Sequence, residues 1–329
     1  MSSPISTTLI PPKFLKPAFL TGSIPFRVSR AHPSVSYTLY IPPHAYNPDP
    51  SRSTSDDPVY SLPRLPLVVV VHGTGRNAER CRDSFKEFAD KHHVAILAPF
   101  FPAGVTSAID LDSYKLLRAA QTFNSDQILL SIIDDEIATI WPGISTSKVF
   151  LVGYSGGGQF CLRMLYIHPK RFQAVSIGAP GRPTFLDSSE SWPNGIRDIQ
   201  VVFGPDAKVD VDAIKTVPAI QLLVGSEDDF IHGGEAFMTF IEQFKAALSK
   251  RHGGDSGRSA ANDLQLSVMK EGRLTGLTRL RESWKELGIA ARFDIVAGVA
   301  HEAHKVIPTV LDFLEPQVEI FRKSYERHP

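Results

Sequence analysis

Short apolar runs alternate with longer amphipathic stretches over most of the chain. LVVVVHG, at residues 67–73, is apolar at consecutive positions, which is typical of a central strand of a parallel sheet, buried on both faces. Similar runs predict strands at residues 94–99, 148–153, 172–180, 219–225 and 291–298. Apolar residues at helical spacing predict helices at residues 79–92, 125–141, 159–168, 235–250 and 306–322. This alternation predicts the α/β class, with a mostly parallel central sheet and helices on both faces.

The first part of the chain follows a different pattern. Residues 1–25 contain several prolines and are expected to form an arm on the surface. Residues 26–41 alternate well enough for a hairpin that extends the sheet as an antiparallel edge. Residues 26–329 are then expected to form a single domain. An irregular stretch at about 181–217 is long enough for a small cap or excursion.

The most informative motif is GYSGG, residues 153–157, which lies between a predicted strand and a predicted helix. It has the form G-x-S-x-G in the strand–turn–helix context of a nucleophile elbow. Such a turn strains the backbone and projects the serine hydroxyl into a cleft, and small neighbours avoid collisions with adjacent elements. We therefore predict that Ser155 is a nucleophile. A glycine-rich turn without chemistry is the alternative, whereas a phosphate loop is disfavoured because no Lys-Ser/Thr pair follows the last glycine.

A serine hydroxyl needs a base that takes its proton. His301 follows the last predicted strand and is the predicted base, with His304, one helical turn further on, as the second choice. Metal binding is the alternative for this cluster of His301, Glu302 and His304. Its spacing is not H-E-x-x-H, so no metal site is expected.

The base needs an acid that orients its ring. Asp228 lies three residues beyond the predicted strand at 219–225, where such an acid belongs. Glu227 and Asp229 are its neighbours, and the sequence alone does not separate them from Asp228.

Two backbone N–H groups are expected to stabilise the developing oxyanion. Gly156, directly after the serine, supplies one of them. Thr74, in the HGTGR segment after the first long strand, is the predicted second donor, with Gly75 next. His72 is interpreted as a packed structural histidine. Arg76 is interpreted either as a contact to a substrate carboxylate or as a surface ion pair.

Aromatic side chains near the carboxyl ends of the strands are expected to shape the substrate pocket, because open α/β sheets bind ligands there. They would suit a medium-sized apolar acyl or aromatic group, and Trp192 is the expected wall of a lid. Packing under the loops is the alternative for each of them. The predicted substrate-binding residues are Tyr154, Phe100, Phe101, Trp192 and Phe230, besides Arg76.

The amino-acid composition indicates which classes of partner the protein is expected to bind. Lys+Arg and Asp+Glu both number 35, so no net field favours nucleic acid or an anionic membrane. We expect a small-molecule substrate and a monomer or homodimer. Two cysteines, Cys81 and Cys161, fit a reducing compartment. Because the N-terminus also lacks the apolar core of a signal peptide, a cytoplasmic location is expected.

Taken together, these motifs resemble those of the α/β-hydrolase superfamily. HGTGR matches its oxyanion loop, GYSGG its nucleophile elbow, GSEDD its acid loop and GVAHE its histidine loop, in the order Ser, Asp, His. Within the superfamily, YTLYIPP followed by LPLVVVVHGTG is similar to stand-alone esterases related to polyhydroxybutyrate depolymerases and feruloyl esterases.

The resemblance implies hydrolysis of a carboxylic ester of a small, fairly apolar substrate. Ser155, His301 and Asp228 would act through an acyl-serine intermediate, with no cofactor and no metal. A lyase, cyclase or condensation enzyme that tailors a secondary metabolite is the alternative, because the same Ser-His-Asp geometry serves such reactions. A ligand-binding receptor that reuses the fold is a third possibility.

Overall fold

A mixed sheet, mostly parallel, runs through the middle of the computed structural model, which describes residues 20–52, 56–108, 110–120, 123–229, 239, 243 and 271–326. Within these residues the sheet has eight strands in the order β1-β2-β4-β3-β7-β8-β9-β10. The pairs from β4 to β10 are parallel, and β1 and β2 are antiparallel to their neighbours. The strands are β1 (Gly22–Val28), β2 (Ser36–Ile41), β3 (Leu65–Val71), β4 (Ala95–Phe100), β7 (Ile144–Tyr154), β8 (Phe172–Gly178), β9 (Ala219–Gly225) and β10 (Arg292–Val296).

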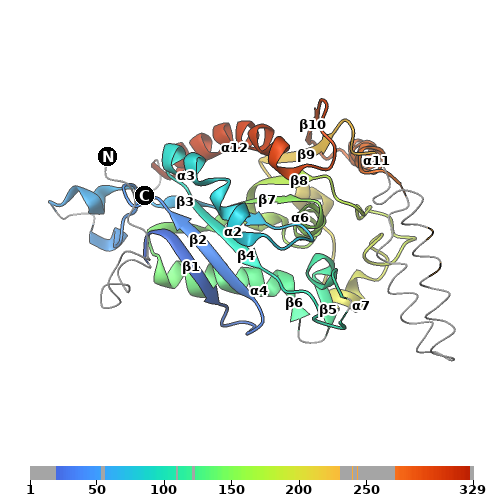
Figure 1. The fold of residues 1–329 in the computed structure, drawn as a ribbon, viewed down its shortest axis with the longest axis horizontal. Helices are drawn as coiled ribbons and strands as arrows, with labels where there is room; N and C mark the ends of the chain where they lie inside the picture. Colours follow the sequence, from blue (N-terminus) through green and yellow to red (C-terminus); the bar gives the residue numbers. More distant parts are fainter. Residues whose placement is uncertain are drawn as a thin grey trace.

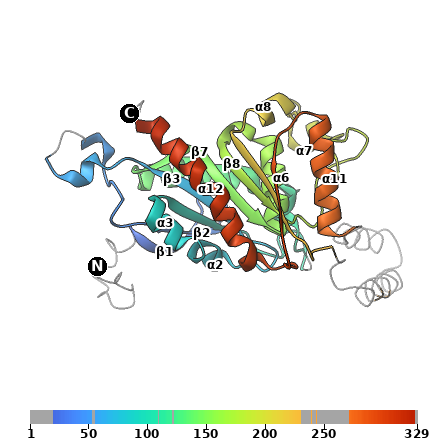
Figure 2. The same cartoon turned by 90° about the horizontal axis from the view of Figure 1, so that it is seen from above.

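Helices cover both faces of this sheet, as the sequence predicts (Figure 1). One face carries α2 (Ala78–Asp83), α3 (Lys86–His92) and α12 (Ala303–Glu326). The other face carries α4 (Ser125–Ser131), the π-helical turn η6 (Ile132–Ile137), α5 (Ala138–Ile140), α6 (Gly156–Ile167) and α11 (Arg273–Glu286). Figure 2 shows α12 crossing in front of the strands and α11 at the right of the sheet.

Shorter elements connect these layers. Two short strands, β5 (Arg118–Ala120) and β6 (Phe123–Asn124), pair outside the main sheet. Residues 181–217 contain α7 (Ile199–Phe203) and α8 (Val211–Lys215). The 3₁₀ turns are η3 (Pro50–Arg52), η4 (Pro58–Ser61), η5 (Ser113–Leu116) and η7 (Pro169–Arg171).

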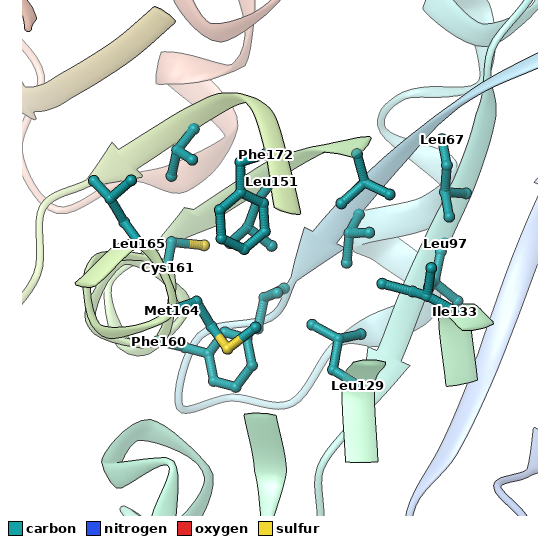
Figure 3. Packing of buried hydrophobic residues seen from close by; sticks show 14 of the residues in the cluster. Leu67, Leu97, Leu129, Ile133, Leu151, Phe160, Cys161, Met164, Leu165 and Phe172 are labelled. Carbon is teal, nitrogen blue, oxygen red and sulfur yellow. The ribbon is translucent and has the colours of Figure 1, made fainter. Parts of the chain in front are cut away.

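Alternating residues of β3 fill the two cores. Leu67 and Val69 face the core beneath α4 and α6, and Val68 and Val70 face the core beneath α3 and α12. All seven residues of this strand are buried, which explains its continuous apolar sequence. Figure 3 shows how side chains of α6 meet those of the strands and of α4 in the first of these cores.

Three elements differ clearly from the sequence prediction. Strand β1 begins at Gly22, inside the predicted arm, because Ile24 is completely buried in the core. The predicted helix at 79–92 divides at Phe85 into α2 and α3. Helix α11 was not predicted. Of the predicted helix at 235–250, the structure describes only residues 239 and 243, which are both helical.

Within the described parts of the chain, no helix combines the length and the apolar character that crossing a membrane requires.

Candidate active site

Ser155 occupies a strained turn between β7 and α6. Strand β7 ends at Tyr154 and α6 begins at Gly156, so Ser155 alone connects them. Its φ of 59° and ψ of −117° lie in a region that L-residues rarely adopt. The Ser155 amide donates a hydrogen bond to the Gly178 carbonyl of β8, at 2.8 Å, and holds the turn against the sheet. The structure therefore contains the strand–turn–helix context that the motif requires.

Close contact between backbones explains the glycine at position 157. A β-carbon on Gly157 would lie 2.2 Å from the Val71 carbonyl oxygen of β3. Real β-carbons essentially never come so close, so a larger residue would push α6 away from the sheet. The glycine lets the first turn of α6 approach the end of β3, where the predicted oxyanion loop begins.

His301 and Asp228 are hydrogen-bonded partners. The Nδ1 atom of His301 lies 2.6 Å from Oδ2 of Asp228. Asp228 follows β9 and His301 follows β10, and these two strands are parallel neighbours. The Glu227 amide donates to the Val299 carbonyl at 2.9 Å, which ties the two loops together. A carboxylate accepts at Nδ1, so this nitrogen carries the proton and Nε2 is the basic nitrogen.

Asp229 has a different task. Its carboxylate accepts hydrogen bonds from the amide and the hydroxyl of Thr275, both at 2.9 Å, in the first turn of α11. Asp228 is only 3% exposed, whereas Asp229 and Glu227 are exposed. Of the three adjacent acids, only Asp228 is paired with His301.

Two further groups contact the Asp228 carboxylate, and neither role was predicted. Arg273, at the start of α11, forms an ion pair with it at 3.0 Å, and both side chains are buried. The Tyr154 hydroxyl lies 3.4 Å from Oδ2 of Asp228. The ring of Tyr154 stacks on the His301 ring at a centroid distance of 5.0 Å. Burial, and then the nearby Asp228 carboxylate, raise the pKa of Tyr154, so its hydroxyl stays protonated.

His304 lies one turn further along, at the start of α12, and is exposed. Its neighbours Glu302 and Lys305 form an ion pair at 2.9 Å. Within the part of the chain that the structure describes, no group of three His, Cys, Asp or Glu side chains could hold a metal ion.

The predicted oxyanion donors lie side by side. A β-carbon on Gly156 would lie 3.2 Å from the Thr74 amide nitrogen and 2.5 Å from the Tyr114 hydroxyl. Gly156 therefore lies against the loop that contains Thr74, and a side chain at this position would force its neighbours to shift. Gly75, the second choice, is exposed in the same loop.

His72 is a packed structural histidine. It is completely buried, its Nδ1 lies 2.8 Å from the Gly73 carbonyl oxygen, and its Nε2 accepts a hydrogen bond from the Phe101 amide at 3.0 Å. Burial lowers its pKa to about 4. The neutral ring thus joins the oxyanion loop to the chain that follows β4.

Arg76 stabilises the same loop. Its guanidinium donates to the carbonyl oxygens of Thr74, Phe101 and Leu111, at 2.8, 3.1 and 3.0 Å. It also lines the cavity described next.

Ser155 and His301 line one cavity of about 1130 Å³. Thr74, Tyr154 and Arg273 line it too, together with Lys115 and Arg182, which the sequence did not single out. The last residues of β3, β7 and β8 line it, so the cavity lies at the carboxyl ends of these strands, as expected of a ligand site in an open α/β sheet.

Three predicted pocket aromatics need correction, because none of them lines this cavity. Phe101 is completely buried, with its ring stacked on Tyr114 at 5.5 Å. The Phe100 ring packs edge-on against Phe26 at 5.9 Å. Trp192 packs against Phe203 at 5.0 Å, and its Nε1 donates to the Leu116 carbonyl at 2.8 Å. All three side chains pack against other residues of the protein, as the alternative interpretation proposed, and do not face the cavity.

Phe230, the remaining predicted pocket aromatic, lies outside the described residues. Tyr154 and Arg76 do line the cavity.

Comparisons with known proteins find structures with a similar fold. No protein-family model matches the chain, and no curated protein matches it significantly. Poly(aspartic acid) hydrolase-1 from Sphingomonas sp. KT-1 has a TM-score of 0.60 and 17% identity over 89% of this chain and 98% of its own. A poly(3-hydroxybutyrate) depolymerase from Bordetella parapertussis has a TM-score of 0.57 and 18% identity, over 84% and 82%.

An S-formylglutathione hydrolase from Agrobacterium tumefaciens has a TM-score of 0.50 and 14% identity, over 91% of this chain and 99% of its own. At such low identities these likenesses establish a fold and leave the reaction to be argued from the site. The sheet order, the helices on both faces and these similar structures agree with the resemblance seen in the sequence. The chain therefore has the α/β-hydrolase fold.

Proposed function

We propose that the protein hydrolyses a carboxylic ester through an acyl-serine intermediate. The observation that carries this proposal is the hydrogen bond of 2.6 Å between His301 and the buried Asp228, in a cavity that Ser155 also lines. A base oriented by an acid, in the same cavity as a serine on a strained turn, is an arrangement suited to activating a hydroxyl for acyl transfer.

The first half of the reaction forms the acyl-serine. The Ser155 oxygen attacks the carbonyl carbon of the ester, and Nε2 of His301 takes the hydroxyl proton. The carbonyl oxygen becomes an oxyanion, to which the N–H groups of Thr74 and Gly156 donate. The tetrahedral intermediate then collapses: the bond to the leaving alcohol breaks, and His301 returns its proton to that alcohol.

Water completes the reaction. It attacks the acyl-serine carbonyl while His301 takes one of its protons, and the second tetrahedral intermediate releases the acid and returns the proton to Ser155. Asp228 stabilises the imidazolium that forms twice in this cycle. The ion pair with Arg273 positions Asp228, because it fixes the second carboxylate oxygen while the first faces His301.

Labelling with a fluorophosphonate probe tests this proposal directly. The probe should modify wild-type protein at Ser155, as read by intact mass and peptide mapping, and should not modify Ser155→Ala. A folded wild-type protein that does not react would contradict an activated serine, whatever the substrate.

Isotope incorporation separates hydrolysis from lyase, cyclase or condensation chemistry. An ester turned over in H₂¹⁸O should yield an acid that carries one solvent oxygen, because water attacks the acyl carbon. A product free of ¹⁸O would favour the non-hydrolytic alternative with the same serine.

A further inference from the structure

Two cations bind a single carboxylate beside the cavity, and the backbones of both accept hydrogen bonds from a third cation, Arg163. The Nζ atom of Lys115 lies 2.5 Å from one oxygen of Asp112, and the guanidinium of Arg182 lies 2.6 Å from the other. Arg163 is completely buried. Its guanidinium donates to Thr184 Oγ1 and to the carbonyl oxygens of Lys115 and Arg182, which are all uncharged.

This cluster carries more positive charge than its own carboxylate neutralises. The side chains of Lys115 and Arg182 are only 5% and 14% exposed. Burial lowers the pKa of Lys115. Burial and then repulsion from Arg182 lower the pKa of Arg163 to about 9. Buried charges are costly unless they are paired, so an additional anion beside these cations would be stabilised.

Donors remain for such an anion. A lysine ammonium has three N–H donors and a guanidinium has five. Within the described residues, Asp112 is the only hydrogen-bond partner of the side-chain nitrogens of Lys115 and Arg182. Asp110, the other acid nearby, is held by its own loop, where it accepts hydrogen bonds from the amides of Asp112 and Ser113.

The cluster lies within reach of the candidate nucleophile. Lys115, Arg182 and Asp112 line the same cavity as Ser155. A β-carbon on Gly156, the residue after Ser155, would lie 2.8 Å from Cε of Lys115. A substrate whose carbonyl reaches Ser155 therefore passes close to this positively charged wall.

We infer that the ester bound at this site carries a carboxylate, which Lys115 and Arg182 bind at the cavity wall beside Ser155. This inference rests on the proposed ester hydrolysis and adds the substrate class. Charge-assisted hydrogen bonds from ammonium and guanidinium groups suit a carboxylate, and Asp112 already occupies one such position. The carboxylate belongs either to the acyl part or to the alcohol part of the ester, and the two pairs of esters below distinguish these positions.

Two matched pairs of esters test the inference. On the acyl side, the 4-nitrophenyl half-ester of adipic acid is compared with the 4-nitrophenyl ester of adipic acid monoamide. On the alcohol side, 4-carboxyphenyl butyrate is compared with 4-carbamoylphenyl butyrate. The preference is the ratio of kcat/KM for the carboxylate to kcat/KM for the uncharged amide. We expect wild-type protein to prefer the carboxylate at least about tenfold in one pair, as the strength of charge-assisted hydrogen bonds predicts.

Variants locate the source of that preference. Lys115→Met and Arg182→Gln should each remove most of the preference for the carboxylate. Asp112→Asn should increase this preference, because it frees both cations for the substrate.

Arg80→Gln is the matched control, since Arg80 is an exposed cation of the same cavity and lies outside the cluster. If Arg80→Gln lowers the preference as much as Lys115→Met does, the attraction is diffuse and the inference is wrong. Thermal melting shows which variants are folded. If only one of Lys115→Met and Arg182→Gln is folded, that variant alone tests the inference.

Failure of the inference and failure of the proposed function give different results. Hydrolysis of both members of each pair at similar rates would overturn the inference and leave ester hydrolysis intact. If no ester is hydrolysed, titration calorimetry with adipate and with benzoate decides the question. Binding by wild-type protein that Lys115→Met weakens about tenfold or more would support the anion site, and no binding of either anion would overturn it.

Discussion

At the scale of single residues, three side chains among the described residues contact the Asp228 carboxylate, and each restricts it differently. His301 binds one carboxylate oxygen, Arg273 binds the other, and the Tyr154 hydroxyl approaches the first. The carboxylate is therefore held in one orientation in a buried place. A carboxylate fixed in this way can hold the His301 imidazole in a single tautomer, as the proposed mechanism requires.

Exchange of the two candidate histidines by alanine tests which of them is the base. His301→Ala should lower kcat/KM for an ester at least about ten-thousandfold, because it removes the group that takes the serine proton. His304→Ala should lower it a few-fold at most, since His304 is exposed at the start of α12. Steady-state kinetics of both variants provide the measurement. An active His301→Ala beside an inactive His304→Ala would reverse the assignment.

At the scale of elements, the site depends on how closely α6 packs against the ends of β3 and β8. Gly157 touches the backbone of Val71, and the Ser155 amide binds the carbonyl of Gly178. The first turn of α6 therefore contacts the backbone of both strands. Helix α11 adds Arg273 and is itself capped by Asp229.

Replacement of Gly157 by alanine tests this packing. Gly157→Ala should lower the free energy of unfolding by about 1–3 kcal/mol or more, the usual cost of overpacking, because α6 must move away from β3. Gly75→Ala is the control. A β-carbon there meets only the Asn77 side chain, at 3.6 Å, and should change stability by less than about 0.5 kcal/mol. Urea unfolding measures both variants, and equal effects would show that the close contact is unimportant.

At the scale of the whole molecule, the sheet gathers distant segments at one edge. The predicted oxyanion loop, the serine turn and the histidine loop follow β3, β7 and β10 and line one cavity, and the acid loop after β9 contacts the histidine loop. His72 links this edge to the remainder of the sheet, because its buried ring joins the end of β3 to the chain after β4.

The buried, uncharged His72 predicts how stability depends on pH. Its pKa is about 4 in the folded protein and about 6.5 ordinarily. The unfolded chain therefore binds a proton below about pH 6.5 that the folded protein does not bind until about pH 4. The contribution of His72 is complete above pH 6.5. It falls as the pH drops towards 4, by about 3 kcal/mol at most.

Urea unfolding of wild-type protein and of His72→Asn at a series of pH values between 7 and 4.5 measures this effect. The variant should lose less stability across this interval than wild-type protein does. An identical slope in both proteins would show that His72 is not the group that titrates.

The sequence alone determined the layout of the protein. Continuous apolar runs such as residues 67–73 identified the central strands, because burial on both faces demands them. The glycines around Ser155 identified the turn, and chain order pointed to His301. Each of these features depends on residues that lie close together in the chain. It can therefore be recognised from the periodicity and spacing of the sequence. The sequence of α11 also contains such a pattern, since Leu277, Leu280 and Trp284 recur at helical spacing and are buried.

The roles of residues with distant partners became clear from the three-dimensional structure. Asp228 and Asp229 are adjacent and chemically identical, and they differ because one faces His301 while the other caps α11. Phe101 and Trp192 lie near the strand ends but pack against Tyr114 and Phe203 instead of facing the cavity. Four charged residues form one cluster because folding brings together segments that are distant in the sequence: Asp112, Lys115, Arg163 and Arg182. No spacing along the chain encodes such contacts, since they arise from the packing of elements distant in sequence.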